Sequence, residues 1–209
     1  VLVSEWLEDC QLDHVWVSLE ESDSDLRRFL TYLLAGIEGV VPGACLETRS
    51  LAEAPELSVP TLARCLSNDL ETLASPLCVV LEDYHLIASS SAVHGLLEQL
   101  LKHPVRTLRL VLVSRLDPPL ELARLRANAM LTEVRMRDLR FTEAQTVELL
   151  GNSGVAEPST EALEILEREL EGWAAGLRLV LAALRHERQG LAVRREGRQV
   201  RLRHVGCQA

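Results

Sequence analysis

The feature that most constrains the fold is a run of five apolar residues at 77–81, Leu-Cys-Val-Val-Leu. Such a run is typical of a strand that is buried on both faces of a parallel sheet. Parallel strands need crossover connections, which are usually helices. Here apolar residues at helical spacing alternate with two further β-rich runs, so we expect an α/β fold with a parallel sheet. The expected strands are residues 14–19, 77–81 and 108–113, and the expected helices are residues 1–10, 26–37, 60–73 and 91–103.

The alternation of helices and strands continues with one more expected helix and strand and then ends. Thr142-Glu-Ala-Gln145 has the form of a capping box, which predicts the start of a helix. Two more helical patterns follow it without a strand between them, so the last part of the chain is expected to be all-helical. The remaining expected elements are a loop at 44–57, a short helix at 122–127, a strand at 131–136, and helices at 161–170 and 173–184.

These patterns predict three regions, namely an α/β domain at 1–140, a helical subdomain at 141–188 and a tail at 189–209. From Arg185 onward the chain has seven arginines against two glutamates, whereas the whole chain carries a net charge of −9. An acidic body repels nucleic acid, so any contact with DNA would have to come from the basic tail or from parts outside this chain. No aromatic residues interleave these arginines and no helical face organises them, so we interpret the tail as a disordered or out-of-frame end rather than a nucleic-acid patch.

Composition excludes several classes of protein. No run of eighteen uncharged apolar residues is present, so we expect no membrane span, and nothing indicates secretion, which makes the cytoplasm the expected location. The five cysteines are an odd number without a C-x-x-C pair or a zinc-type spacing, so we expect them to be reduced. Cys65 and Cys78 lie among apolar residues and are interpreted as small buried side chains.

Polar side chains follow two of the expected strands. Glu82 and Asp83 come directly after residues 77–81, and Ser114 and Arg115 follow the next strand. The carboxyl ends of parallel strands meet at one edge of a sheet, where ligands bind. One carboxylate there could hold Mg²⁺ while the other orients a water molecule, and the guanidinium could contact a terminal phosphate. Taken alone, the two acids are a weak signal, because acids often follow strands. For the arginine by itself, a surface salt bridge is the more common explanation.

Four strings occur in one order along the chain, and together they are far more specific than their parts. The chain resembles the nucleotide-binding region of the MalT-like, LuxR-type transcriptional regulators, a branch of the STAND P-loop ATPases, over about residues 1–185. Residues 15–19 and 28–33 also look like a strand and helix of that family. The four strings are Leu81-Glu-Asp-Tyr-His-Leu-Ile87, residues 114–126, Asp138-Leu-Arg-Phe141 and Glu171-Gly-Trp-Ala-Ala-Gly-Leu177.

The resemblance implies a switch in which ATP with Mg²⁺ and an inducer stabilise an active, self-associating state of the intact regulator. A C-terminal helix-turn-helix, missing from this chain, then binds DNA. Glu82 and Asp83 match the Walker B acids, with Glu82 as the metal ligand and Asp83 as the catalytic carboxylate, and Ser114 and Arg115 match the nucleotide sensor. The family usually has Asp where this chain has Glu82, which is one methylene longer.

A second departure concerns the phosphate loop, which needs Gly-Lys followed by Ser or Thr. The single lysine is Lys102, between Leu101 and His103, so no Walker A motif is present. By resemblance the family's phosphate loop would end just before Val1. We therefore expect a P-loop-NTPase-like parallel sheet lacking its first strand, followed by a helical subdomain.

The missing strand would lie between the strands near residues 110 and 133, so its absence leaves a gap of about 10 Å or makes those strands re-pair. Either outcome exposes unpaired backbone. We expect this chain to bind ATP poorly, if at all, and to be inactive, although the intact regulator would be a slow ATPase. The alternative is a non-catalytic protein-interaction module that acts through the helical part.

Overall fold

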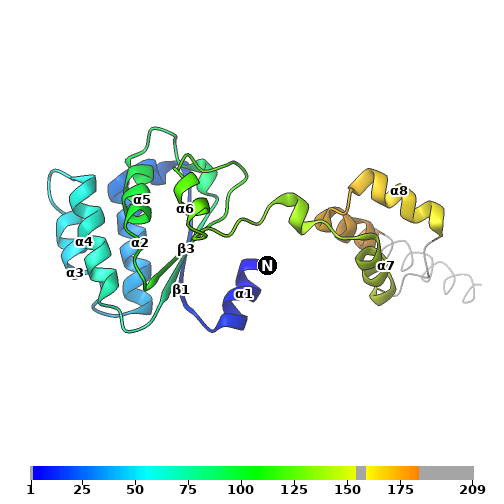
Figure 1. Ribbon diagram of the computed structural model, residues 1–209, viewed down its shortest axis with the longest axis horizontal. Helices are drawn as coiled ribbons and strands as arrows, with labels where there is room; N and C mark the ends of the chain where they lie inside the picture. The colour runs from blue at the N-terminus through cyan, green and yellow to red at the C-terminus, as the bar shows by residue number, and fades with distance from the viewer. Residues whose placement is uncertain (1, 154–158, 184–209) are drawn as a thin grey trace, which may run out of the picture. The chain divides into compact units, whose positions relative to one another are not determined.

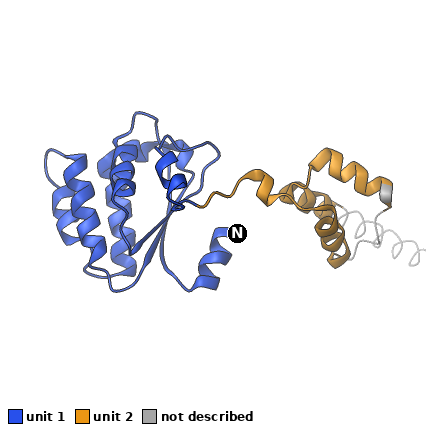
Figure 2. Ribbon diagram, in the orientation of Figure 1, with its two compact units in different colours: residues 1–131 blue, residues 132–209 orange. Residues whose placement is uncertain are grey.

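The computed structural model describes residues 2–153 and 159–183. The chain divides into two compact units, Val1–Leu131 and Thr132–Ala209, which are described separately below (Figure 2). The division falls before the boundary near residue 140 that the sequence suggested. The basic tail at 189–209 lies outside the described residues.

The first unit is built on a three-stranded parallel sheet with the order β1-β2-β3 (Figure 1). In the register of the sheet, Val15 lies opposite Val79, which lies opposite Leu110. The central strand is buried along residues 77–81, as the apolar run predicted, and the expected α/β fold is confirmed. The strands are β1 (Asp13–Ser18), β2 (Leu77–Glu82) and β3 (Leu108–Leu112).

One face of the sheet carries the main hydrophobic core. Val15 and Val17 of β1 and Val79 and Leu81 of β2 point to this face and pack against apolar helix stripes. Asp25 caps the first of these helices by accepting a hydrogen bond from the backbone N–H of Arg28. The packed helices, which lie together on one side of the sheet in Figure 1, are α2 (Leu26–Val40), α4 (Val59–Glu71) and α5 (Ala92–Lys102).

The opposite face of the sheet has only a thin cover in the described part of the chain. Leu7 of helix α1 (Leu2–Cys10) packs there against Cys78 and Val80 of β2. Trp6 and Trp16 remain 41% and 36% exposed. Helix α1 lies on the other side of the sheet from α2 and α5 (Figure 1). The two faces therefore differ in burial at β1, where Trp16 is exposed while Val15 and Val17 are buried, and not at β2, where both faces are buried.

The expected loop at residues 44–57 is wrong in part, because helix α3 (Leu46–Ala52) forms there. This helix begins after Cys45, whose backbone is left-handed (φ 57°), and no side chain of its own caps it. Instead Asp69 of α4 accepts hydrogen bonds from the backbone N–H (2.9 Å) and the hydroxyl (2.7 Å) of Thr48. A seven-residue helix that depends on a cap from another helix has little local sequence signal.

The expected strand at residues 131–136 is also wrong. Residues 131–135 have no regular structure, and a 3₁₀ turn, η3 (Met136–Leu139), follows. Within the described residues, β3 pairs with β2 alone. Residues 131–136 therefore do not pair with β3, and no strand of the described part lies along its outer edge. A strand is stable only when a neighbour accepts and donates its backbone hydrogen bonds, and residues 131–136 have none.

The second unit is helical where it is described, in agreement with the sequence pattern. Thr142 and Gln145 form the expected capping box at the start of a helix. The N–H of Phe141 donates to the carbonyl of Gly172, and Gly172 has φ +72°, where a Cβ would collide with that same segment. The remaining elements are 3₁₀ turns η1 (Glu21–Ser24) and η2 (Tyr84–Leu86), helices α6 (Ala123–Ala127), α7 (Glu143–Asn152) and α8 (Thr160–Leu170), and helical residues 174–183.

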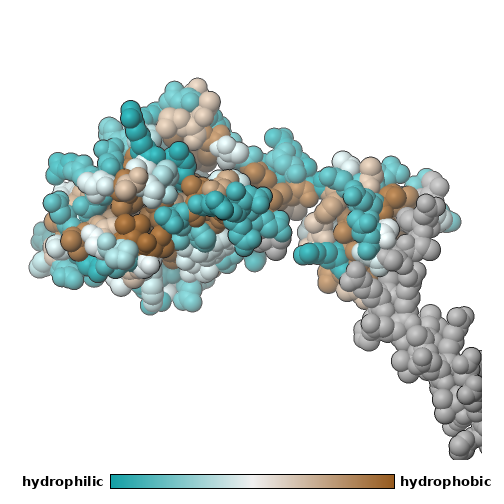
Figure 3. Space-filling view, turned by 90° about the horizontal axis from the view of Figure 1, so that it is seen from below, coloured by the Kyte–Doolittle hydropathy of each residue, from teal (hydrophilic) through white to brown (hydrophobic). Residues whose placement is uncertain are grey.

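The surface mixes hydrophobic and hydrophilic patches in the view of Figure 3. Leu46 and Leu116 are the most exposed leucines of the first unit, at 60% and 68%. None of the helices in the described part combines the length and the apolar character that crossing a bilayer requires.

Candidate functional site at the carboxyl edge of the sheet

The candidate residues meet at one edge of the sheet because β2 and β3 are parallel neighbours. The pairing continues beyond the strand ends, since the N–H of Val113 donates to the carbonyl of Leu81 (2.9 Å) and the N–H of Tyr84 donates to that of Val113 (3.0 Å). Glu82 and Asp83 therefore leave the sheet beside the Ser114-Arg115 step. The structure places both pairs at the same edge, as the sequence predicted.

Glu82 is held by two hydrogen bonds from β1. Its Oε2 accepts from Trp16 Nε1 (2.9 Å) and from the hydroxyl of Ser18 (2.8 Å). Ser18 lies directly opposite Glu82 in the sheet, and residues 16 and 18 point to the same face. The bonds from Trp16 and Ser18, in that order of importance, lower the pKa of Glu82, so the carboxylate is ionised at neutral pH.

Sequence reasoning assigned no role at the site to Trp16 and Ser18. A signal was present, because two polar groups alternate on one face of a strand next to the strand that ends in Glu82. Only the cross-strand register shows which of the two acids they reach.

Asp83 occupies a different position from its neighbour. Its backbone is left-handed (φ 55°, ψ 36°), which turns the chain out of the strand and into η2. Its side chain is 45% exposed, and its Oδ1 lies 3.9 Å from His85 Nδ1. This Nδ1 is a buried atom without a hydrogen-bond partner among the described residues. The carboxylate of Asp83 is accordingly accessible, and the imidazole beside it has an unused polar atom.

A chain of hydrogen bonds that starts at a buried pair, Tyr84 and His94, holds the segment that follows the acids. The hydroxyl of Tyr84 lies 2.6 Å from His94 Nδ1, and His94 Nε2 lies 3.0 Å from the carbonyl of Ala88. The N–H of Ala88 in turn donates to the hydroxyl of Ser24, which lies at the end of η1 (2.8 Å). Burial raises the pKa of Tyr84, which therefore stays protonated as the donor. The loops after β1 and β2 are thus fixed to one another.

Ser114 and Arg115 are at the expected edge, but among the described residues no side-chain hydrogen bond or ion pair joins them to the acids. The hydroxyl of Ser114 donates to the carbonyl of Leu116 (2.6 Å), which closes a local turn. The side chain of Arg115 is exposed, and none of the ion pairs found in the described part of the chain includes it. Arg115 is therefore available to an anion, whereas the hydroxyl of Ser114 already has a partner.

The residues at this edge fit a divalent cation better than they fit a triphosphate. Glu82 Oε1 and the Asp83 carboxylate are oxygen donors of the type that Mg²⁺ prefers. They do not form a three-ligand cluster with another acid, histidine or cysteine within the described residues. Lys102, the only lysine, is the last residue of α5, which carries the chain back toward the opposite edge of the sheet, where β3 begins. The 209 residues of this chain therefore place no lysine at the carboxyl edge.

A parallel α/β sheet with acids at the carboxyl end of its buried central strand is consistent with a P-loop-NTPase-like fold. No family model matches the chain. It is 32% identical over 186 residues to the HTH-type transcriptional regulator MalT of Yersinia enterocolitica, 32% identical over 185 residues to that of Serratia proteamaculans, and 33% identical over 187 residues to that of Yersinia pestis. Each alignment covers 88% of this chain and 20% of the relative.

These similarities confirm the resemblance that the four strings indicated. Over most of its own length the chain is related to part of these MalT-type proteins. It spans about a fifth of the length of the curated relatives that it matches.

Proposed function

We propose that the chain is part of an ATP-dependent switch module, which couples ATP and inducer binding to DNA binding in an intact, cytoplasmic MalT-like regulator. The observation that carries this proposal is that Glu82, Asp83 and Arg115 lie at one carboxyl edge of a parallel sheet. The relatives are named as HTH-type transcriptional regulators, which supports DNA binding through a part of the regulator outside this chain.

Each residue at the edge has a distinct role in this proposal. Bound Mg²⁺ would neutralise phosphate charge, and Glu82 is the residue that would hold it, through Oε1 or a water molecule. Trp16 and Ser18 fix the carboxylate of Glu82 by binding its Oε2. Asp83 is exposed enough to accept a hydrogen bond from an attacking water, and Arg115 would contact the terminal phosphate.

We further propose that this chain by itself binds ATP weakly, because the carboxyl edge has no lysine to contact the β- and γ-phosphates. Isothermal titration of the 209-residue chain with ATP and Mg²⁺ tests this statement. We expect that any binding of ATP is weaker than a submillimolar Kd. A submillimolar Kd that Asp83→Asn abolishes would show that the edge binds ATP without a phosphate loop.

Determination of the upstream reading frame tests the larger proposal. A Gly-x-x-x-x-Gly-Lys-Thr string directly before Val1 would supply the phosphate loop, and the longer protein should then bind ATP and lose Mg²⁺-dependent binding with Glu82→Gln. An unrelated upstream sequence would contradict the switch.

The exposed apolar side chains of the second unit favour a second candidate, a non-catalytic protein-interaction module. Ile165, Trp173 and Leu179 are 44%, 48% and 67% exposed. The two candidates predict opposite results in a promoter-reporter assay of the intact regulator. If the chain is part of a switch, Glu82→Gln should abolish reporter activation and Trp173→Ala should leave it unchanged. If the chain is an interaction module, Trp173→Ala should abolish reporter activation and Glu82→Gln should leave it unchanged.

A further inference from the structure

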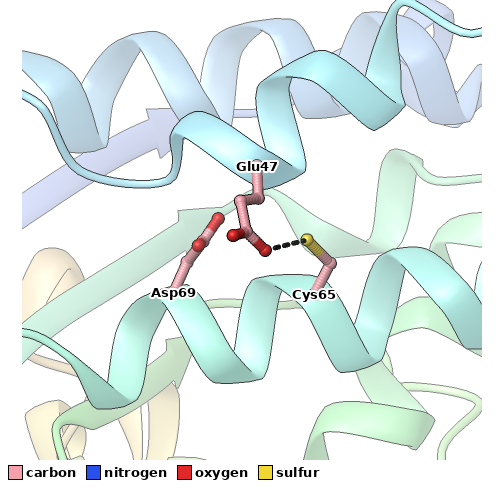
Figure 4. A group of neighbouring side chains, drawn as sticks. All are labelled: Glu47, Cys65 and Asp69. Atoms are coloured by element: carbon pink, nitrogen blue, oxygen red, sulfur yellow. Dashed lines mark hydrogen bonds between the residues drawn. The ribbon is translucent and has the colours of Figure 1, made fainter.

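A cluster of metal-ligating side chains lies between α3 and α4, away from the carboxyl edge. Cys65 and Asp69 are four residues apart on α4 and so project from the same face of the helix, while Glu47 reaches them from α3 (Figure 4). One ligand atom from each residue lies within 4.8 Å of the other two. Cys65 Sγ and Glu47 Oε2 are 3.9 Å apart. Three donors from two helices thus converge on one point.

Among the described residues, no cationic side chain pairs with the two carboxylates of this cluster, Glu47 and Asp69. The arginine of α3, Arg49, instead lies 3.5 Å from Glu38. Two carboxylates that approach this closely without a cationic partner repel each other. A bound cation would convert that repulsion into attraction.

The donors also have the orientation and access that a metal site needs. The two hydrogen bonds that Asp69 accepts from Thr48 both go to Oδ2, which fixes the carboxylate and leaves Oδ1 for a ligand. Cys65 is only 8% exposed, whereas Glu47 is exposed and opens the cluster to solvent. Burial raises the pKa of the Cys65 thiol, so it keeps its proton while no metal is bound.

We propose that Glu47, Cys65 and Asp69 form a binding site for Zn²⁺, with water as the fourth ligand. A thiolate with two carboxylates suits a borderline cation better than Mg²⁺ or Ca²⁺, which prefer oxygen alone. Tetrahedral Zn–S and Zn–O bonds of about 2.3 and 2.0 Å put neighbouring ligand atoms roughly 3.5 Å apart, so a small contraction of the cluster is sufficient. When the Zn–S bond forms, the thiol proton passes to the buffer. The metal ties the short helix α3 to α4.

Titration of the 209-residue chain with Co²⁺ tests this proposal, because a thiolate bound to Co²⁺ gives a near-ultraviolet charge-transfer band. We expect the band to appear with one Co²⁺ per chain and to disappear when Zn²⁺ is added. Cys65→Ser should abolish it, and Glu47→Gln should weaken Co²⁺ binding at least tenfold. Cys10→Ser and Glu53→Gln are matched controls at exposed positions outside the cluster and should change nothing.

Two results would overturn the proposal, namely a wild-type chain without the band and a band that persists in Cys65→Ser. Circular dichroism shows whether Cys65→Ser is folded. If it is not, Glu47→Gln decides, since Glu47 is exposed and its substitution leaves the core intact. Unchanged Co²⁺ affinity in Glu47→Gln would then count against the site.

Discussion

The two faces of the sheet in the first unit differ in how they are buried and in what they carry. On one face, α2, α4 and α5 bury the side chains of Val15, Val79 and Leu81 in a large apolar cluster. On the other, α1 covers Cys78 and Val80 through Leu7, and Trp16 stays partly exposed. The second face also carries the hydrogen bonds that hold Glu82. One face thus provides most of the stability, while the other positions the candidate metal ligand.

The largest difference in the free energy of unfolding is expected from replacing one buried leucine by alanine in a helix on each face. Leu30 of α2 is fully buried and Leu7 of α1 is 2% exposed. Leu30→Ala should lower the free energy of unfolding by about 4 kcal/mol, because the surrounding core cannot collapse into the cavity. Leu7→Ala should lower it by about 2 kcal/mol, because the thin cover on that face can adjust. Urea denaturation of both variants measures the difference, and equal losses would show that the two faces are equally well packed.

A smaller effect is expected from the buried hydrogen bond of Tyr84. Tyr84→Phe removes the hydroxyl and leaves His94 Nδ1 buried without its partner. We expect a loss of about 2 kcal/mol in the free energy of unfolding, the usual effect of an unsatisfied buried polar atom. His94→Ala in the Tyr84→Phe background tests the pairing. If the two substitutions were additive, the hydrogen bond would contribute nothing.

The matching substitution on the thin face is Trp16→Phe, which removes the bond from Nε1 to Glu82. Trp16 is 36% exposed and solvent can replace the lost donor. We therefore expect a loss below about 1 kcal/mol. The same denaturation experiment as for Tyr84→Phe gives the comparison, and a loss larger than that of Tyr84→Phe would reverse the ranking of the two faces.

The smallest effect is expected from the pH dependence that Glu82 contributes. Its pKa is lowered in the folded state, so its stabilising contribution is present above the ordinary glutamate value near 4.5 and is lost as the pH falls through the lower, folded value. Unfolding free energies measured from pH 6 to pH 3 should fall less steeply in Glu82→Gln than in the parent. Parallel curves for the two proteins would mean that Trp16 and Ser18 do not act on the charge.

The pattern of apolar residues was sufficient to predict the three strands, because each is a β-rich run whose position depends on local sequence. The helices with apolar stripes and local caps, such as the one after Asp25, were also predicted. Helix α3 was missed because Asp69, far along the chain, caps it. The strand at 131–136 was predicted from local propensity and is absent, because propensity cannot supply the neighbouring strand that its backbone needs.

At the candidate site, the sequence by itself determined which acids follow the buried strand and that Arg115 follows the next one. Their chain positions, together with the rule that parallel strands end at one edge, were enough for that conclusion. The tertiary structure alone decided that Trp16 and Ser18 bind Glu82 and that Glu47 meets Cys65. These contacts join residues far apart in the sequence through cross-strand register and helix packing, which depend on the whole fold rather than on spacing along the chain.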